Sequence, residues 1–418
     1  MSLEQLEKLR HEMKKCVRCS LCKLVPMPTI QQTRFTSACP PVDEYHFHAY
    51  SGGGMQVMAL ALLDGRIAVD QDLAQVVSAC TTCGLCDVSC KFIMAAERQD
   101  VILALKEHIA EFGLGTAPVG EFKPTLAPWA EGLNLRTSPA SKCRVLLYVG
   151  AGADRDPRQA ATARHLAQLL QHARVDFGIP EGGEPDSGIE AYWTGHRRRL
   201  EEQARRVVDM LDNSRAEMIV TLGGEDLGML RSKYPRYGCA PKAKVVHASE
   251  FLLPLVQKGR LRLTHPVRQT VSYHDPCYLG RQSEPPLVWQ GEERRTHGVM
   301  TYFVPPKPIN YGVHGVFDAP RQLLGAIPGL RLVEMYRIRE YAYCCGGGGG
   351  VPDSHPKVAR SAALQRVEEA RAVGAERLVT ACQRCRLNLT RWQDGDATPV
   401  IDLVDLVYEA SGIGSRHD

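Results

Sequence analysis

Cysteine is the residue type in this sequence with the greatest potential for chemistry. The 418 residues include 15 cysteines: eight lie within residues 16–90, five lie within residues 277–385, and Cys143 and Cys239 stand between the two groups. The sequence has no signal peptide, so we expect a reducing intracellular environment, in which clustered cysteines bind metal more often than they form disulfides. The clustering therefore predicts two metal-binding regions.

The N-terminal group contains two closely spaced motifs. They are Cys16-x2-Cys19-x2-Cys22, followed later by Cys39-Pro40, and Cys80-x2-Cys83-x2-Cys86-x3-Cys90. In the bacterial ferredoxin motif, three thiolates of one tight loop bind one [4Fe–4S] cubane, and the fourth cysteine binds the other cluster. The motifs therefore predict two [4Fe–4S] cubane clusters, with the crossed ligand sets Cys16, Cys19, Cys22 and Cys90, and Cys80, Cys83, Cys86 and Cys39.

Two features depart from the usual ferredoxin motif. Sixteen residues separate Cys22 from Cys39, where three are usual, and Lys91 replaces the proline that commonly follows the last cysteine. Structural zinc is the alternative, but zinc sites generally use paired C-x2-C knuckles that together supply four ligands. Two C-x2-C-x2-C triplets therefore favour iron–sulfur chemistry over zinc.

The C-terminal group has a different spacing. Its parts are His274-Asp275-Pro276-Cys277, Cys344-Cys345-Gly346 and Cys382-x2-Cys385. Adjacent cysteines do not readily bind one iron, but they can bind neighbouring irons of a larger cluster. Gly346 and Gly347 are cofactor-binding candidates, because glycine lets the backbone approach sulfides and donate N–H hydrogen bonds. His274 either hydrogen-bonds a sulfide, moves a proton, or is a buried core residue.

The remaining sequence indicates how these residues are positioned. Residues 1–115 predict a helical domain, with short helices at 55–63 and 73–79 and a longer helix at 93–112. Residues 116–143 are rich in proline and glycine and are expected to be a linker. From residue 144 onward the pattern predicts an α/β fold. Its strands are expected at 145–149, 218–221, 245–246, 270–273 and 378–380, and its helices include 159–172 and 356–373.

The α/β part contains an internal repeat of two units, residues 144–265 and 266–418. Residues 217–221 (EMIVT) resemble residues 376–380 (ERLVT). The positions of Cys277, Cys344, Cys345, Cys382 and Cys385 in the second unit correspond to Ala151, Asp186, Ser187, Gly223 and Asp226 in the first. We therefore expect the first unit to be a degenerate copy without thiolate ligands, since hard carboxylates suit an iron–sulfide cluster poorly.

The five-cysteine constellation, preceded by two ferredoxin-type motifs, resembles the CCG-domain iron–sulfur oxidoreductases, and in particular the D subunit of heterodisulfide reductase. Relatives with a similar layout are the K subunit of the sulfite-reduction-linked membrane complex, the glycolate and glycerol-3-phosphate oxidase iron–sulfur subunits, and the D subunit of the large benzoyl-CoA reductase complex. The resemblance implies an N-terminal helical two-cluster domain, ferredoxin-like, followed by two repeated α/β CCG-type units. It also implies one noncubane [4Fe–4S] cluster, bound by Cys277, Cys344, Cys345, Cys382 and Cys385. These cysteines and His274 are candidate catalytic residues.

The resemblance predicts an oxidoreductase subunit that relays electrons through the two cubanes to or from the noncubane cluster. In one interpretation, that cluster is a reductive active site for a disulfide or another thiol-derived substrate. In the other, the chain is a non-catalytic electron conduit of a flavin-dependent 2-hydroxy-acid or glycerol-3-phosphate oxidase. The missing ligands of the first unit favour the non-catalytic conduit. The intact ligand set of the second unit favours a catalytic role for its cluster. Either way, we expect redox partners, such as a flavoprotein, a heterodisulfide reductase-like protein or a membrane cytochrome.

Composition and charge exclude other classes of function. The 51 basic and 47 acidic residues nearly balance, and aromatic residues make up only 6% of the chain. Neither property suggests a nucleic-acid partner. No apolar run approaches the ~18 residues that span a bilayer. The sequence therefore predicts a cytoplasmic protein, which a partner can hold at the inner face of the membrane.

Overall fold

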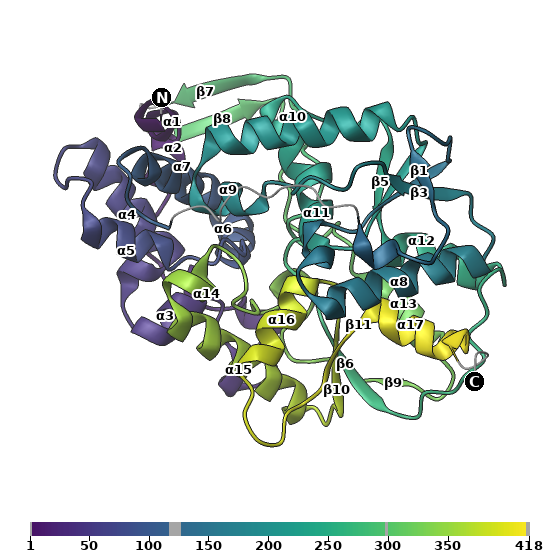
Figure 1. Ribbon diagram of the computed structural model, residues 1–418. Coiled ribbons are helices and arrows are strands. Elements are labelled where there is room, and N and C mark those ends of the chain that lie inside the picture. The colour runs from purple at the N-terminus through teal and green to yellow at the C-terminus, as the bar shows by residue number, and fades with distance from the viewer. Residues whose placement is uncertain (1, 117–126, 297–299, 415–418) are drawn as a thin grey trace.

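A computed structural model describes residues 2–116, 127–296 and 300–414 of the chain. It consists of a helical N-terminal part and an α/β part with two parallel sheets (Figure 1). Both classes of structure are confirmed, helical at the N-terminus and α/β after it. The segment expected to be a linker, 116–143, lies partly outside the described residues, and its residues 136–138 form a strand of the first sheet.

Short helices joined by cysteine-bearing loops form the N-terminal part. The α-helices are α1 (Ser2–Lys8), α2 (Arg10–Lys14), α3 (Pro40–Tyr45), α4 (Gly52–Leu63), α5 (Gln71–Ser78), α6 (Leu85–Met94) and α7 (Arg98–Glu111). Leu6, Met13, Ala59, Val77 and Leu105 are buried together where these helices meet. This small apolar core holds the helices, and so the loops between them, in fixed positions.

The predicted helix at 93–112 is wrong at its N-terminal end. Ile93 and Met94 complete α6, and Ala95 then adopts a left-handed conformation with φ of 50°. Helix α7 begins only at Arg98, whose backbone N–H donates to Asp87 Oδ1 at 2.5 Å. The apolar periodicity continues across this break, so the sequence pattern alone does not reveal it.

The first sheet has the strand order β1-β3-β2-β4-β5, and all of its pairings are parallel. Its strands are β1 (Arg136–Ser138), β2 (Val145–Tyr148), β3 (Phe177–Pro180), β4 (Met218–Thr221) and β5 (Lys244–His247). The accompanying helices are α8 (Pro157–His172), α9 (Ile189–Thr194), α10 (Arg197–Asn213), α11 (Gly224–Gly228) and α12 (Ala248–Gln257). Strand β2 is buried along its whole length, as expected where both faces of a parallel sheet are covered.

The second sheet has the order β11-β10-β6-β9 and is also parallel. Its strands are β6 (Thr270–His274), β9 (Arg331–Leu332), β10 (Arg377–Thr380) and β11 (Val400–Asp402). The helices are α13 (Asp318–Gly325), α14 (Val351–Ser354), α15 (Pro356–Ala372), α16 (Gln383–Arg391) and α17 (Leu403–Ser411). Apart from the edge strand β1, the two sheets have corresponding strand orders, β3-β2-β4-β5 and β9-β6-β10-β11.

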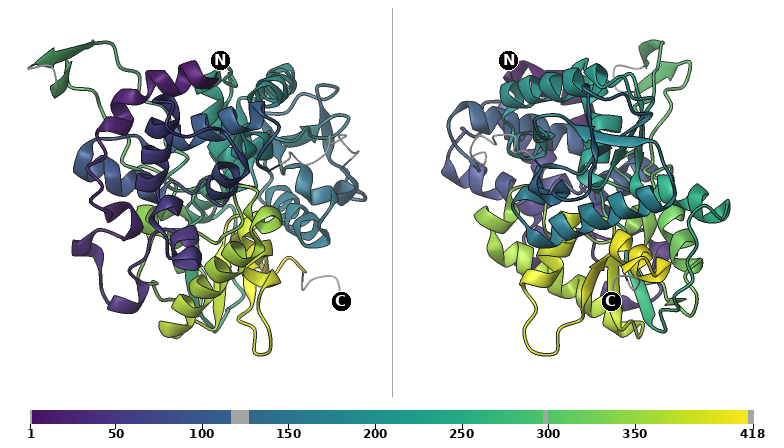
Figure 2. Two further views of the ribbon diagram at one scale, coloured as in Figure 1. Left: turned by 90° about the vertical axis from the view of Figure 1, so that its left-hand side faces the viewer. Right: turned by 45° about the vertical axis from the view of Figure 1, so that its right-hand side comes forward.

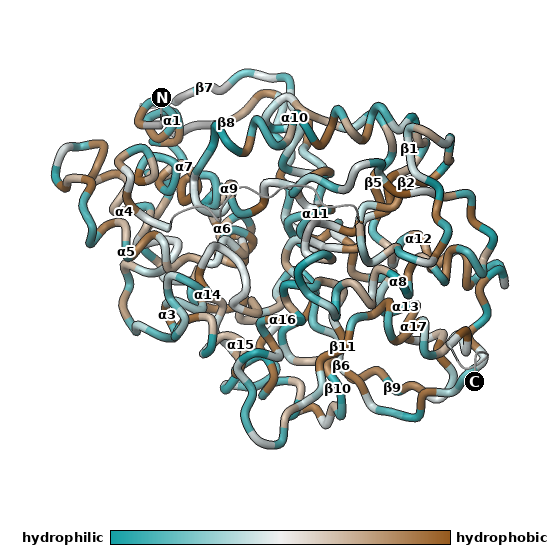
Figure 3. Tube along the Cα trace, in the orientation of Figure 1, coloured by the Kyte–Doolittle hydropathy of each residue, from teal (hydrophilic) through white to brown (hydrophobic). Residues whose placement is uncertain are grey.

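One hydrophobic core joins the two sheets. Leu147 and Val220 of the first sheet belong to the same buried cluster as Val271 and Val379 of the second. The last helix of each unit packs on a helix of the other, α12 on α13 and α17 on α8, as Figure 1 shows for α17 and α8. Figure 3 shows the hydrophobic trace at β5 and β6, inside this arrangement. Neither sheet therefore has a complete core of its own.

An antiparallel hairpin is inserted between β6 and α13. It consists of β7 (Glu292–Thr296) and β8 (Met300–Val304), and it projects from the body beside α1 and α2 (Figure 2). The amine of Lys15 lies 5.9 Å from the ring centroid of Phe303, so the base of the hairpin contacts the start of the first cysteine loop.

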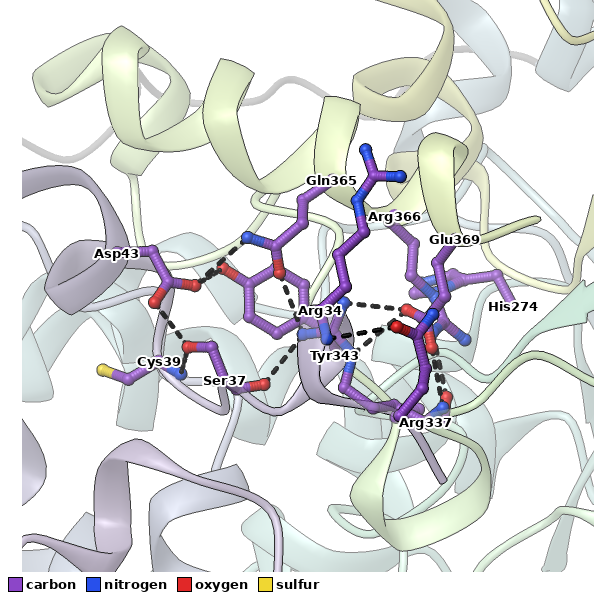
Figure 4. Close-up of polar contacts among 12 residues, drawn as sticks. Arg34, Ser37, Cys39, Asp43, His274, Arg337, Tyr343, Gln365, Arg366 and Glu369 are labelled. Carbon is purple, nitrogen blue, oxygen red and sulfur yellow. Dashed lines mark hydrogen bonds and ion pairs between the residues drawn. The ribbon is translucent and has the colours of Figure 1, made fainter. Parts of the chain in front are cut away.

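A buried acid lies at the centre of the second α/β unit (Figure 4). Glu369 on α15 has no exposed surface, and its Oε2 accepts hydrogen bonds from Arg337 Nη2 at 2.8 Å and Arg366 Nη1 at 2.7 Å. Burial opposes ionisation of Glu369, but the charges of Arg366 and Arg337 outweigh it and lower the pKa of this carboxyl group. Glu369 is therefore ionised in the folded protein and holds two buried guanidinium groups.

The same two arginines connect distant parts of the chain. Arg337 Nη1 donates to the carbonyl oxygen of Ser37 at 2.8 Å, in the loop before α3. Arg366 Nε donates to Nδ1 of His274 at 3.0 Å, at the end of β6. Figure 4 shows both contacts on opposite sides of Glu369. The network thus fixes the helical part against the strand that carries His274.

We predict that Glu369→Ala destabilises the protein by about 3–5 kcal/mol, because it leaves two buried guanidinium groups without their counter-charge. The urea midpoint of the circular dichroism transition, measured anaerobically, should fall accordingly. The neighbouring Glu368→Ala is the matched control, since Glu368 is exposed and pairs with Arg34 at the surface, where such pairs contribute at most about 1 kcal/mol. Equal midpoints for the two variants would contradict the assignment.

Candidate iron–sulfur sites

The four thiols of the first predicted set meet at one cavity in the helical part. Cys16, Cys19, Cys22 and Cys90 all line it. The loop from Cys16 to Cys22 turns tightly because Arg18 and Ser20 adopt left-handed conformations, with φ of 58° and 65°. This loop brings three thiols to one place, and α6 supplies the fourth. We name this cavity site 1.

The second predicted set lines a neighbouring cavity, site 2, which is formed with Cys39, Cys80, Cys83 and Cys86. Cys39 immediately precedes α3, which Pro40 begins. Thr82 and Gly84 turn the loop with φ of 52° and 75° before α6 starts. The eight thiols thus fall into two groups of four with the crossed composition of the motif.

Helix α6 explains how the crossing arises. Cys86 and Cys90 lie four residues apart on it, which places them about 6 Å apart along the helix axis. The N-terminus of α4 lies between the two cavities: Gly53 N–H donates to Cys22 Sγ at 3.4 Å, and a Cβ atom on Gly52 would lie 3.1 Å from Cys86 Sγ. The partial positive charge of a helix N-terminus suits two anionic thiolate–iron centres.

Arg98, at the start of α7, supplies a buried cation to site 1. Its Nε donates to Cys90 Sγ at 2.8 Å. Burial raises the pKa of Cys90 to about 11, and Arg98 limits this rise. Nη2 of Arg98 is buried and has no hydrogen-bond partner within the described residues. Such an orphaned donor beside four thiols fits an anionic group bound in the cavity.

Lys91 replaces the usual proline for a structural reason. It lies inside α6, and its amine pairs with Asp87 at 2.7 Å and Glu97 at 2.9 Å. The pairs hold α6 against the segment that leads into α7. Proline at this position would lose both pairs and break the helix that carries Cys90.

The five cysteines of the C-terminal set come from three loops of the second unit. Cys277 follows β6, Cys344 and Cys345 precede α14, and Cys382 and Cys385 begin α16. Cys345 Sγ lies 3.2 Å from Cys385 Sγ, and Cys277 packs against the buried cluster that contains Cys344. All except Cys277 are at most 5% exposed. We name this group site 3.

His274 takes part in site 3. One ring nitrogen of His274 and the sulfur atoms of Cys345 and Cys385 all lie within 4.8 Å of one another. Because Nδ1 accepts a hydrogen bond from Arg366, the proton of the neutral ring is assigned to Nε2, which has no other partner within the described residues. Burial lowers the pKa of His274, so the ring is neutral and donates toward the thiols. Of the alternatives for this residue, the contact favours a hydrogen bond to the site.

Gly346 and Gly347 form one wall of site 3. Their backbone N–H groups donate to Cys344 Sγ at 3.3 Å and Cys345 Sγ at 3.4 Å. Gly346 has φ of 84°, and a Cβ atom there would lie 2.7 Å from the carbonyl oxygen of Ala359. The two N–H groups and five thiols are the donor set that suits an iron–sulfur cluster.

The first α/β unit contacts site 3 through a carboxylate and supplies no sulfur there within the described residues. Glu225, between Gly223 and Asp226, accepts a hydrogen bond from Cys382 Sγ at 2.9 Å. Burial raises the pKa of Asp226 to about 8, with the charge of Glu225 adding to the rise. Asp186 accepts from the N–H of Gly188 and caps its own loop. Of these carboxylates, Glu225 is therefore the one that contacts a thiol of site 3.

Sites 2 and 3 touch each other. Cys83 of site 2 packs with Cys344 of site 3 in one buried cluster, and Cys344 and the charge of Arg281 lower the pKa of Cys83 to about 5. Arg281 is buried between the sites, where it donates to the carbonyl oxygens of Cys83 at 2.7 Å and Ala342 at 2.8 Å. Tyr278, next to Cys277, donates to the carbonyl oxygen of Thr82 at 3.3 Å. The three sites therefore form a continuous series across the molecule.

Sequence reasoning missed several residues that contact the thiols. Arg98, Glu225 and Arg281 carry no local motif, and the partners of Glu225 and Arg281 lie far away in the chain. The glycines 52–54 did carry a signal, since three consecutive glycines at a helix start are unusual without a close neighbour. His46 and Cys143, by contrast, line none of the three sites within the described residues.

Comparison with protein families identifies both cysteine-rich regions. Residues 12–92 match the family described as Fer4_8, a 4Fe-4S dicluster domain, and contain all eight thiols of sites 1 and 2. Residues 300–390 match the CCG family, a cysteine-rich domain, and contain four of the five thiols of site 3. The chain thus contains a 4Fe-4S dicluster domain and a CCG domain, and it is similar to the D subunit of heterodisulfide reductase. The predicted family is thus confirmed, together with the iron–sulfur nature of the cofactors.

Individual relatives agree with this family. The D subunit of a dihydromethanophenazine:CoB–CoM heterodisulfide reductase from Methanosarcina mazei is 28% identical over 81% of this chain and 79% of its own length. A probable iron-sulfur-binding oxidoreductase of Bacillus subtilis is 27% identical over 87% of this chain, and a probable membrane-anchored ferredoxin of Chromohalobacter salexigens is 30% identical over 83%. This CCG-domain protein spans about half the length of the latter two.

Among solved structures, the resemblance is weak. A hypothetical protein from Helicobacter pylori aligns over 75% of this chain and 58% of its own at 10% identity, with a TM-score of 0.42, which is too low to support an argument. Within the described residues, no helix has the length and apolar character required to traverse a bilayer.

We predict that Cys90→Ala removes the cluster of site 1 and spares that of site 2, because Cys90 lines the cavity with Cys16, Cys19 and Cys22. Cys39→Ala should have the opposite effect. Mössbauer and EPR spectra of the anaerobic proteins, together with iron content, distinguish the two clusters. Cys143→Ala, outside all three sites, should change neither. Loss of the site 2 signal in Cys90→Ala would refute the crossed ligand sets.

Proposed function

We propose that this CCG-domain protein is an iron–sulfur oxidoreductase subunit that relays electrons between a redox partner and site 3. The observation that carries the proposal is the contact between sites 2 and 3, where Cys83 of the dicluster domain packs with Cys344 of the CCG domain in one buried cluster. A dicluster domain packed directly on a second metal site serves electron transfer to that site. Gly52 and Gly53, at the start of α4, lie between the thiols of sites 1 and 2 and so connect site 1 to the same series.

The residues that would hold the cofactors are the three thiol groups. Sites 1 and 2 would each hold a [4Fe–4S] cubane, and site 3 would hold a noncubane [4Fe–4S] cluster. Bound clusters supply one-electron carriers whose potentials depend on hydrogen bonds to sulfur and on burial. The chain contributes the N–H groups of Gly53, Gly346 and Gly347 and the buried cations Arg98 and Arg281. All of these favour an added negative charge and so favour reduction.

The two α/β units are proposed to be repeats, as their corresponding strand orders support. The first unit would then be a scaffold. It completes the shared core, and α8 contacts α17 through His165 Nδ1 and Asp405 Oδ1 at 2.9 Å. Asp405 also pairs with Arg386 of α16 at 2.7 Å, one residue after Cys385. The degenerate unit thereby positions the helix that begins with the ligands of site 3.

Catalysis at site 3 is favoured by a cavity next to it. Gly347 of the site lines this cavity together with Trp193, Thr194, Arg384 and Asn388. An opening at the end of an electron relay gives a small substrate access, which a pure conduit does not need. We therefore propose heterodisulfide reductase-like chemistry on a disulfide or other thiol-derived substrate, within a complex of redox subunits. The conduit for a flavin-dependent oxidase is the second candidate.

The first test is an iron inventory. Three clusters of four irons predict about twelve irons per chain, with a similar amount of acid-labile sulfide, in protein purified anaerobically from its native host. Colorimetric iron and sulfide assays and metal analysis measure both. Stoichiometric zinc with little sulfide would refute the proposed cofactors.

The second test separates site 3 from the relay. Cys345→Ser should remove the noncubane signal and abolish turnover with the physiological partner, while both cubanes are still reduced by dithionite. Asp186→Ala should leave cluster content and turnover unchanged, because Asp186 binds no iron in this proposal. EPR-monitored reduction and steady-state turnover give the two readings. Full turnover of Cys345→Ser, or a fourth cluster lost in Asp186→Ala, would overturn the assignment.

A further inference from the structure

We infer that the surface around site 1 is the docking face for a small acidic electron-carrier protein. The inference rests on the proposed function and adds where electrons enter or leave the chain and what kind of partner exchanges them. It begins with exposure. Cys19 is the one thiol of the three sites that is exposed among the described residues, whereas four of the five thiols of site 3 are buried. Site 1 is therefore the terminus of the series that faces solvent.

Large apolar side chains surround this terminus. Val17 and Ile93 line the mouth of site 1 and are 64% and 43% exposed, and Phe92, beside Ile93, is 70% exposed. Exposed apolar groups gathered around a metal site mark a protein contact more often than free surface. Contacts between redox proteins are small and transient, so a patch of a few side chains suffices.

The charges around the patch determine the kind of partner. Arg18 lines the mouth of site 1 and, with Lys23, lies close enough to His48 to lower the pKa of that ring, in addition to the effect of burial. Neither Arg18 nor Lys23 forms an ion pair with any described residue. Glu12, which precedes this loop in the chain, is already paired with Lys15 at 2.7 Å.

The projecting hairpin adds to the same face. Lys15 lies over the ring of Phe303, and Lys307 lies over the same ring at 5.7 Å. Lys307 is also without an ion pair among the described residues. Unpaired cations thus flank the exposed thiol from two separate segments of the chain. Cations around an apolar centre complement a carrier with acidic residues around its own cofactor, and the opposite charges accelerate association.

The test uses the full-length protein with its clusters and, as probe, a small [2Fe–2S] ferredoxin of strongly negative net charge. Stopped-flow spectroscopy measures electron transfer from the reduced probe at low and high salt, and calorimetry with the oxidised probe measures binding. The double variant Arg18→Glu/Lys23→Glu should slow the second-order reaction and weaken binding at least about tenfold at low salt. The difference should vanish at high salt, where charges are screened.

Matched controls separate this face from net charge. Lys258→Glu/Arg262→Glu makes the same change of charge after α12, on the opposite side of the molecule (Figure 1), and should leave the rate within about twofold of the unaltered protein. Val17→Ser should weaken binding without changing its salt dependence. All variants should retain the site 1 EPR signal and be reduced by dithionite as the unaltered protein is.

The outcomes that overturn the inference are distinct from failure of the proposed function. Equal effects of the two charge-reversed variants would show a general charge effect and reject the face. So would absence of binding between the probe and the unaltered protein, or a dimer in sedimentation that Val17→Ser dissociates, since the occupant would then be a second copy. Absence of a cluster at Cys16, Cys19, Cys22 and Cys90 would instead refute the proposed function.

Discussion

The burial of one carboxylate, Glu369, is the constraint on which the arrangement of the sites depends. An ionised acid without water is tolerated only when paired, and here Arg337 and Arg366 pair with it. Each arginine uses its remaining donors at a different place, Arg337 on the loop before Cys39 and Arg366 on His274. The ion pairs of Glu369 therefore also hold a loop of the dicluster domain in a fixed position relative to His274 at site 3.

The shared core gives the first α/β unit, which supplies no thiol to the three sites, a structural role. Helix α12 of the first unit packs on α13 of the second, and α17 of the second packs on α8 of the first. Each unit therefore covers apolar surface of the other. The first unit also contacts site 3 directly through Glu225 and the packing of Gly224 on Leu279. These contacts need no cysteine in the first unit, so its role in them is structural.

The sequence was sufficient to predict those features that depend on neighbouring residues in the chain. Cysteine spacing predicted the family, and apolar runs predicted β2, β4, β6 and β10. It failed where side-chain pairs decide the structure, whether within a short stretch of chain or between distant segments. The break between α6 and α7 depends on Lys91, whose partners Asp87 and Glu97 lie on both sides of it. Arg98 and Arg281 escaped notice because an isolated arginine has no periodicity, and only the fold shows that each is buried against thiols.

The two ends of the series of sites differ in burial and in charge. Site 1 has an exposed thiol and positive surroundings, whereas site 3 is closed by glycines, carboxylates and His274, with access through one adjoining cavity. A protein partner needs only to approach a cluster edge, so an exposed, charged rim suits it. A small substrate must bind at the reacting centre, so a cavity suits it. The two ends of the series thus differ in exposure and charge as the proposed relay requires, and site 2 lies between them beside the buried Arg281.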